Sequence, residues 1–151
     1  MLVAGALLFA MHVMPAIARD DTLPTWARSA FTRAATQRGI VRRVQSSKKI
    51  PAMVRGDFDG DGHADIALLV EQRTSHKIGI VILHDSPRAA ALFGAGVKFG
   101  NGGDDFEWMD HWTIAKVDSS RSDALLVERE ESGGGLIVFV RGAYHWRQRG
   151  D

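Results

Sequence analysis

The chain of 151 residues contains no cysteine, and this absence excludes several kinds of chemistry. Without a thiol there is no disulfide, no thiolate metal site, no cysteine nucleophile and no lipoprotein anchor attached through cysteine. Prolines are few, at four, whereas glycines number sixteen. A chain with so many turn-forming glycines favours a fold of short strands over a helical bundle.

An excess of charge of either sign is also absent. Nineteen lysines and arginines against eighteen acidic residues give a formal net charge of +1. Proteins that bind nucleic acid or an anionic membrane surface concentrate positive charge, so we expect no nucleic-acid partner. A hydrophobic content of 45% and a charged content of 25% are ordinary for a globular protein, and the length suits one domain.

The N-terminus carries the one long apolar run. Residues 2–18 are almost entirely apolar and end in Ala16-Ile17-Ala18, which matches the small-residue site of signal-peptide cleavage. We predict a signal peptide over 1–18 and a single β-rich domain over 19–151, exported to the periplasm or secreted, with no membrane association after cleavage. An uncleaved anchor and a buried helix are the alternatives, although the run is short for a membrane span.

The hydrophobic pattern that follows predicts one helix and then strands. The helix begins with Thr22 as N-cap, ends at Arg38, and places Trp26, Ala30 and Ala34 on one face for packing on a sheet. The expected strands cover residues 66–71, 78–83, 89–93, 112–117, 123–129, 136–141 and 144–148. Most connections are too short for parallel crossovers. We therefore predict a mainly β (α+β) fold with the helix on an antiparallel sheet of about six or seven strands, not a closed propeller.

The strongest motif is DFDGDGHAD at residues 57–65. Four aspartates within nine residues repel one another unless a cation neutralises them. Calcium takes six to eight oxygen ligands, which short carboxylates on a glycine-rich turn can supply. In a helix-loop-helix site a bidentate glutamate stands at position 12, but this chain has Leu68 there, so Asp65 is the candidate that completes the ligand set. An acidic turn held by arginines or backbone N–H groups is the alternative.

This D-x-D-x-D-G-x-x-D pattern, with Gly56 before it and an apolar strand after it, resembles the calcium loop of FG-GAP/VCBS repeats. A propeller of such repeats needs several blades, and no second copy of the motif occurs. The resemblance therefore implies a small, exported, non-enzymatic protein whose fold is held by one structural Ca²⁺ ion. It implies that the ion is bound by the backbone carbonyl of His63 and by four carboxylates, those of Asp57, Asp59, Asp61 and Asp65.

A second hypothesis concerns the segment 104–112, in which acidic and aromatic residues alternate. Large aromatic side chains with polar neighbours form recognition surfaces. Phe106, Trp108 and Trp112 could thus bind a protein or glycan partner, as a ligand-binding or inhibitor module. Alternatively, these aromatics cover the open end of the sheet.

A third hypothesis is a calcium-supported hydrolase. The pairs His84-Asp85 and Asp110-His111 could supply a base and its orienting carboxylate, with Ser86 or Ser132 as nucleophile. The chain has no G-x-S-x-G turn to present such a serine. A transition-metal site built from His63, His84 and His111 lacks the helical spacing of paired histidine ligands.

Overall fold

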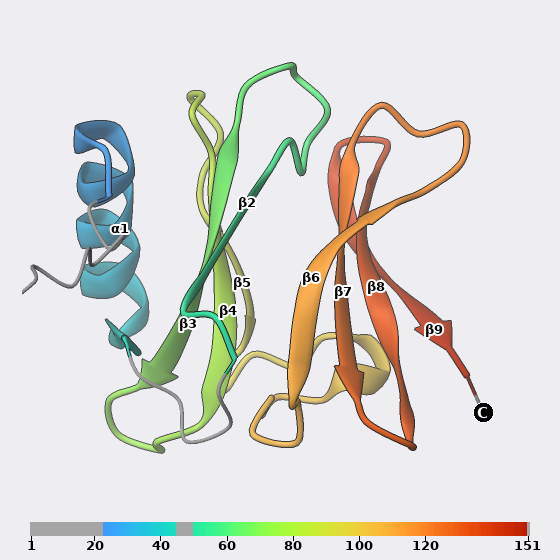
Figure 1. Ribbon diagram of the computed structural model, residues 1–151. Helices are drawn as coiled ribbons and strands as arrows, with labels where there is room; N and C mark the ends of the chain where they lie inside the picture. The colour runs from blue at the N-terminus through green and yellow to red at the C-terminus, as the bar shows by residue number, and fades with distance from the viewer. Residues whose placement is uncertain (1–22, 45–49, 151) are drawn as a thin grey trace, which may run out of the picture.

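The computed structural model describes residues 23–44 and 50–150, so the predicted signal peptide lies outside the described residues. The described chain contains one α-helix and nine strands in two antiparallel sheets, with no closed barrel. Helix, first sheet and second sheet form three successive layers (Figure 1). The predicted mainly β class is confirmed, and the described strands exceed the expected six or seven and divide between two sheets.

The first sheet has the order β1-β3-β4-β5, and β2 also pairs with β3. Its strands are β1 (Ile40–Arg42), β2 (Met53–Gly56), β3 (Asp65–Gln72), β4 (Ile78–Leu83) and β5 (Ala91–Gly94). Strands β1 and β2 pair with successive parts of β3, because Arg42 lies opposite Val70 and Met53 opposite Leu68. Strand β4 is buried throughout, as is most of β3, since both faces of the sheet are covered.

The second sheet is a meander of four strands, β6-β7-β8-β9. Its strands are β6 (His111–Lys116), β7 (Asp123–Arg129), β8 (Gly133–Val140) and β9 (Ala143–Arg149). A long connection that includes the short 3₁₀ helix η1 (Gly100–Gly102) leads from β5 to this sheet. Strand β9 alternates between exposed and half-buried positions, as expected of a strand with one face in water.

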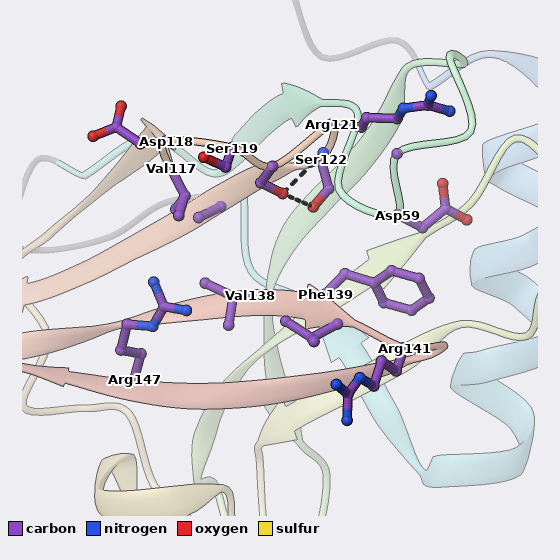
Figure 2. A pocket seen from close by; sticks show the side chains of 14 residues that line it. Asp59, Val117, Asp118, Ser119, Arg121, Ser122, Val138, Phe139, Arg141 and Arg147 are labelled. Atoms are coloured by element: carbon purple, nitrogen blue, oxygen red, sulfur yellow. Dashed lines mark hydrogen bonds between the residues drawn. The ribbon is translucent and has the colours of Figure 1, made fainter.

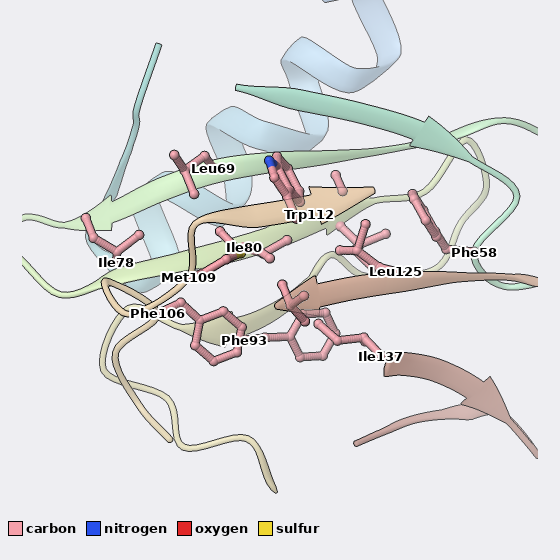
Figure 3. Packing of buried hydrophobic residues seen from close by; sticks show 13 residues of the cluster. Phe58, Leu69, Ile78, Ile80, Phe93, Phe106, Met109, Trp112, Leu125 and Ile137 are labelled. Atoms are coloured by element: carbon pink, nitrogen blue, oxygen red, sulfur yellow. The ribbon is translucent and has the colours of Figure 1, made fainter. Parts of the chain in front are cut away.

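The larger core lies between the two sheets (Figure 3). It includes aromatic residues from both sheets and from the connection between them. Phe106 and Trp112, predicted as partner-binding residues, are each only 1% exposed in this core. That part of the prediction is wrong, because the segment 104–112 turns inward to join the sheets instead of forming an outer surface. The buried members are Phe58, Ala67, Leu69, Ile78, Ile80, Ile82, Phe93, Phe106, Met109, Trp112, Leu125, Val127 and Ile137.

A second core joins α1 (Thr25–Arg38) to the outer face of the first sheet. The helix ends as predicted at Arg38. Gly39 forms the C-cap, where a positive φ of 66° lets its N–H reach the carbonyl of Ala35. Its start differs, because Pro24 and not Thr22 occupies the N-cap position. Proline disfavours helical geometry in the residue before it, which delays the first turn. Within the described residues no helix is long and apolar enough to cross a membrane.

The glycines at 133–135 belong to strand β8, although they lie in the connection between the expected strands 123–129 and 136–141. The reason is the approach of an aromatic ring. A Cβ on Gly135 would lie 2.2 Å from Cζ2 of Trp146, on the neighbouring strand. Glycine within a strand often marks such a close contact, so this run is a packing requirement and not a turn signal.

Candidate metal centre

The aspartate motif forms the loop between β2 and β3, at the top of the molecule in Figure 1. Gly56 pairs with Asp65, so the antiparallel ladder closes directly beneath the loop. Gly60 and Gly62 have φ values of 74° and 88°, in the left-handed region that glycine enters without a steric cost. These two positions let the backbone turn tightly enough to bring alternate aspartates to one side.

The carboxylates of Asp57, Asp59 and Asp61 converge. One oxygen from each lies within 4.8 Å of the others, a spacing at which they could hold a metal ion. Each also accepts a backbone N–H of the loop: Asp57 Oδ2 from Gly62 (3.0 Å), Asp59 Oδ1 from Asp61 (3.2 Å) and Asp61 Oδ1 from His63 (2.8 Å). These bonds fix the directions of the three carboxylates before any ion binds.

The other oxygen of Asp57 has no such partner. Asp57 Oδ1 is buried and accepts no hydrogen bond from the described residues. A buried carboxylate oxygen without a hydrogen bond or a cation is destabilising, so nearly all such atoms in folded proteins have a partner. Asp57 Oδ1 is therefore an acceptor that no described residue uses, and a cation could use it.

Asp65 lies apart from that triad. Its side chain is fully buried, and its two oxygens accept the N–H groups of Phe58 (2.9 Å) and Asp85 (3.3 Å). At the 4.8 Å spacing it groups with Asp59 and His84 and not with Asp57 and Asp61. In the described structure Asp65 thus joins the start of the loop to the end of β4. Its role as a ligand, like that of the His63 carbonyl, stays a prediction.

His84 is a member of the site that the sequence connected only with catalysis or a transition metal. Its side chain is fully buried, and Nδ1 lies 3.3 Å from Asp65 Oδ2 and 3.6 Å from Asp59 Oδ2 without an aligned hydrogen bond. The hairpin register could have revealed this contact. Ile66 pairs with Leu83, so the preceding residue of β3 faces the residue that follows β4.

Cationic and aromatic groups cover this side of the carboxylates. Arg88 Nε lies 3.0 Å from Asp59 Oδ2, and its guanidinium carbon lies 4.5 Å from the Phe139 ring centre. The ring of Tyr144 stacks on His84 at 5.9 Å, with its hydroxyl 3.5 Å from Nε2. Burial, and then the nearby carboxylates, raise the pKa of Tyr144 well above its ordinary value.

The loop is also fastened to the second sheet. The N–H of Asp57 donates to Asp123 Oδ2 (2.9 Å), and the N–H of Asp123 donates to the carbonyl of Asp57 (2.7 Å). Lys116 pairs with the other oxygen of Asp123. Phe58 is 1% exposed and packs in the core between the sheets. Sequence reasoning missed Asp123 and Lys116, since nothing in their local pattern indicates a contact 66 residues away.

A cavity of about 460 Å³ borders the loop on its Asp59–Gly60 side (Figure 2). The opposite walls are the connection 117–122 and the β8–β9 hairpin. Hydroxyls of Ser120 and Ser122 hydrogen-bond at 2.9 Å across one wall. Arg121, Arg141 and Arg147 are among the lining residues, and none forms an ion pair with the described residues.

The structure does not bring the predicted hydrolase residues together. His84 contacts two carboxylates and Tyr144, and no serine, among the described residues. His111 is exposed on the edge strand β6, and Ser132 lines a different cavity. Of the three histidines considered for a transition metal, only His84 belongs to a potential ligand group in the described chain.

Comparison with known proteins finds no matching family model, no matching curated protein and no matching solved structure. The description of this protein therefore rests on its own residues. It is a three-layer, mainly β protein with aspartate-rich groups that could hold a metal ion.

Proposed function

We propose that this chain is an exported, non-enzymatic calcium-binding protein in which the ion has a structural role. The observation that carries the proposal is the convergence of Asp57, Asp59 and Asp61, together with the buried Asp57 Oδ1, which accepts no hydrogen bond from the described residues. Likeness to an FG-GAP/VCBS calcium loop is part of the same proposal, and it rests on the sequence motif alone.

The choice of Ca²⁺ follows from the donor atoms. The triad offers only oxygens on a glycine-rich loop, which suits a hard cation that tolerates irregular geometry, whereas Mg²⁺ demands a near-octahedral set. Zinc prefers nitrogen and sulfur donors, and the only histidine in a potential ligand group among the described residues is His84, which groups with Asp59 and Asp65. Arg88 already pairs with Asp59 on that side, and both oxygens of Asp65 accept backbone N–H groups. A second cation beside His84 is therefore disfavoured.

A structural role follows from the position of the loop. The same residue, Asp57, supplies a carboxylate to the triad and two backbone hydrogen bonds to Asp123 of the second sheet. An ion that neutralises the triad removes repulsion at this junction. At a hundredfold excess over its Kd it stabilises the folded state by about 2.7 kcal/mol. Export places the protein where free Ca²⁺ is high enough for sites with Kd of about 10⁻⁴ to 10⁻³ M.

The test compares Asp61→Asn with Asp118→Asn in calcium titrations by calorimetry. Asp61 is exposed, and asparagine retains the oxygen that accepts the His63 N–H, so the fold is preserved. Asp118 is an exposed aspartate outside the triad and serves as a charge-matched control. We expect the wild type to bind one ion per chain. Asp61→Asn should raise the Kd for calcium at least about tenfold, and Asp118→Asn should leave it unchanged.

Two outcomes would contradict the proposal. One is equal calcium binding by the two variants. The other is tight zinc binding that His84→Gln abolishes, because it would assign the ion to the histidine group.

Export is tested by mass spectrometry of the protein recovered from the periplasm and medium of an expressing bacterium. A chain that begins at residue 19 supports it, and an intact cytoplasmic chain contradicts it.

A further inference from the structure

A second cavity, of about 270 Å³, lies at the opposite end of the second sheet from the metal loop. Strand β7 connects the two places, because it begins at Asp123, which contacts the loop, and ends at Arg129, which lines this cavity. The 3₁₀ helix η1, at the bottom of Figure 1, forms one wall. The lining residues come from η1, the 104–112 segment, the β7–β8 hairpin and β9.

Two half-buried tryptophans form the aromatic walls. The rings of Trp108 and Trp146 lie 6.4 Å apart at an angle of 81°. Both indole N–H groups are already used, that of Trp108 by the carbonyl of Gly102 (2.9 Å) and that of Trp146 by Gln148 Oε1 (2.9 Å). A ligand therefore meets apolar ring surface here, which suits the carbon-bound hydrogens of a sugar ring.

The side-chain amides beside these rings have defined orientations. An indole N–H can only donate, so the group of Gln148 that faces Trp146 must be its oxygen. The same oxygen accepts from Asn101 Nδ2 at 3.2 Å. This arrangement leaves the amide hydrogens of Gln148 and the oxygen of Asn101 without partners among the described residues. They form a preorganised donor and acceptor pair next to the aromatic walls.

A positive charge completes the lining. Arg129 is exposed at the end of β7 and forms no ion pair within the described chain. The hydroxyl of Ser132 lies in the same lining. Gly102 closes the floor, where a Cβ would come within 3.0 Å of the Trp146 ring. Arginine binds carboxylates through two parallel hydrogen bonds, so this corner of the cavity suits an anionic substituent.

We propose that this cavity binds the terminal residue of an acidic saccharide of the uronic acid type. The sugar ring packs on Trp108 and Trp146, its hydroxyls bond to Asn101 and Gln148, and its carboxylate pairs with Arg129. The volume lies just below the roughly 300–1,000 Å³ of drug-sized sites, which suits one sugar residue. For so small a ligand we expect a Kd of about 1 mM. The site is independent of the metal loop and of the function proposed for it.

The test follows the four indole N–H resonances of the ¹⁵N-labelled protein during titration with single sugars. The probes are glucuronic and galacturonic acid, with glucose and galactose as their neutral counterparts. We expect an acid to shift the resonances of Trp108 and Trp146. Trp26 on α1 and Trp112, which is 1% exposed and donates to the Pro51 carbonyl, serve as internal references and should not move.

Two surface variants assign the contacts without removing a tryptophan from the packing. Arg129→Gln should weaken acid binding about fivefold to tenfold, and Gln148→Ala should weaken binding of the same sugar by a similar factor. Arg149→Gln, the same change on the exposed end of β9 outside the lining, should have no effect. The spectrum of each variant shows directly whether it is folded.

Several results would overturn the proposal. The saccharide assignment is wrong if neither acid shifts Trp108 and Trp146 at concentrations well above the expected Kd. It is equally wrong if a polyproline peptide shifts them and no sugar does. Neutral sugars that bind as tightly as their acids, or an Arg129→Gln variant that retains full acid affinity, would exclude the role of the arginine.

Discussion

Substitution of Asp65 by alanine separates the two roles that this aspartate can have, a ligand to the ion or a connection within the protein. The sequence motif places it among the ligands. In the structure, however, both of its oxygens accept backbone N–H groups, from Phe58 and Asp85, and its side chain is fully buried beside His84. If the connection is the main role, the substitution destabilises the protein even when no metal is present.

The magnitude follows from these contacts. Hydrogen bonds to a charged acceptor contribute about 1.5–3 kcal/mol each, and the bond at 3.3 Å belongs at the low end. The alanine also leaves two N–H groups and the imidazole of His84 without their carboxylate. We expect a loss of about 3–5 kcal/mol in the free energy of unfolding in EDTA. At about 3 °C per kcal/mol for a chain of this length, the Tm falls by about 10–15 °C.

Asp61→Ala is the matched comparison, measured by circular dichroism in EDTA and in excess calcium. Asp61 is exposed and accepts one hydrogen bond, from the N–H of His63, so its loss in EDTA should cost about 1 kcal/mol or less. At a calcium concentration a hundredfold above the Kd, the ion should stabilise the wild type by about 2.7 kcal/mol. The Asp61→Ala variant should lose most of this stabilisation.

The opposite pattern would refute this reasoning. In that case Asp65→Ala would have the wild-type Tm in EDTA but would gain no stability from calcium. Asp65 would then be a ligand with little structural role. Urea unfolding gives an independent measure. An unchanged m-value would show that the variant and the wild type unfold from equally compact states.

Two further predictions test the packing and the buried hydroxyl. Gly135→Ala places a Cβ 2.2 Å from Trp146 and should lower the free energy of unfolding in urea by about 3 kcal/mol. The control Gly142→Ala meets no atom within 4 Å but has a φ of 85°, so it should cost about 1 kcal/mol. Equal losses would contradict the packing argument. Tyr144, the one tyrosine, has a pKa that is raised chiefly by burial. Above about pH 10 the unfolded chain therefore releases a proton that the folded chain retains. The free energy of unfolding should then fall by about 1.4 kcal/mol per pH unit. Tyr144→Phe should remove this part of the slope, and an absorbance titration in EDTA that finds native tyrosinate near pH 10 would contradict the prediction.

Local patterns predicted the elements whose formation depends on neighbours in the chain. The β3–β4 hairpin matches the predicted strands closely, because its apolar runs are bounded by polar turns. The helix ends at Arg38 as expected, since Gly39 readily adopts the left-handed conformation of the cap. The convergence of Asp57, Asp59 and Asp61 likewise follows from their alternation on a glycine-rich turn.

Features that depend on contact between distant segments could not be predicted in this way. An alternating acidic and aromatic segment is compatible with an outer surface, and only the packing of two sheets shows that Phe106 and Trp112 are core residues. Strand β2 was missed because four residues carry too little periodicity to define a strand by themselves. Asp123 resembles any aspartate at a strand start, and its importance comes from the position of Asp57.

The loop's connection to both sheets changes the expected effect of an ion bound there. A loop that served only to end a hairpin could lose its ion at a local cost, because exposed turns open without disturbing the strands beneath them. Here Phe58 is buried between the sheets, Asp57 bonds to β7, and Asp65 bonds to the residue after His84. Repulsion among the carboxylates therefore acts on the contact between the sheets, where the larger of the hydrophobic cores lies. Under the function proposed above, an ion held by Asp57, Asp59 and Asp61 would remove this repulsion and so stabilise the packing of the two sheets.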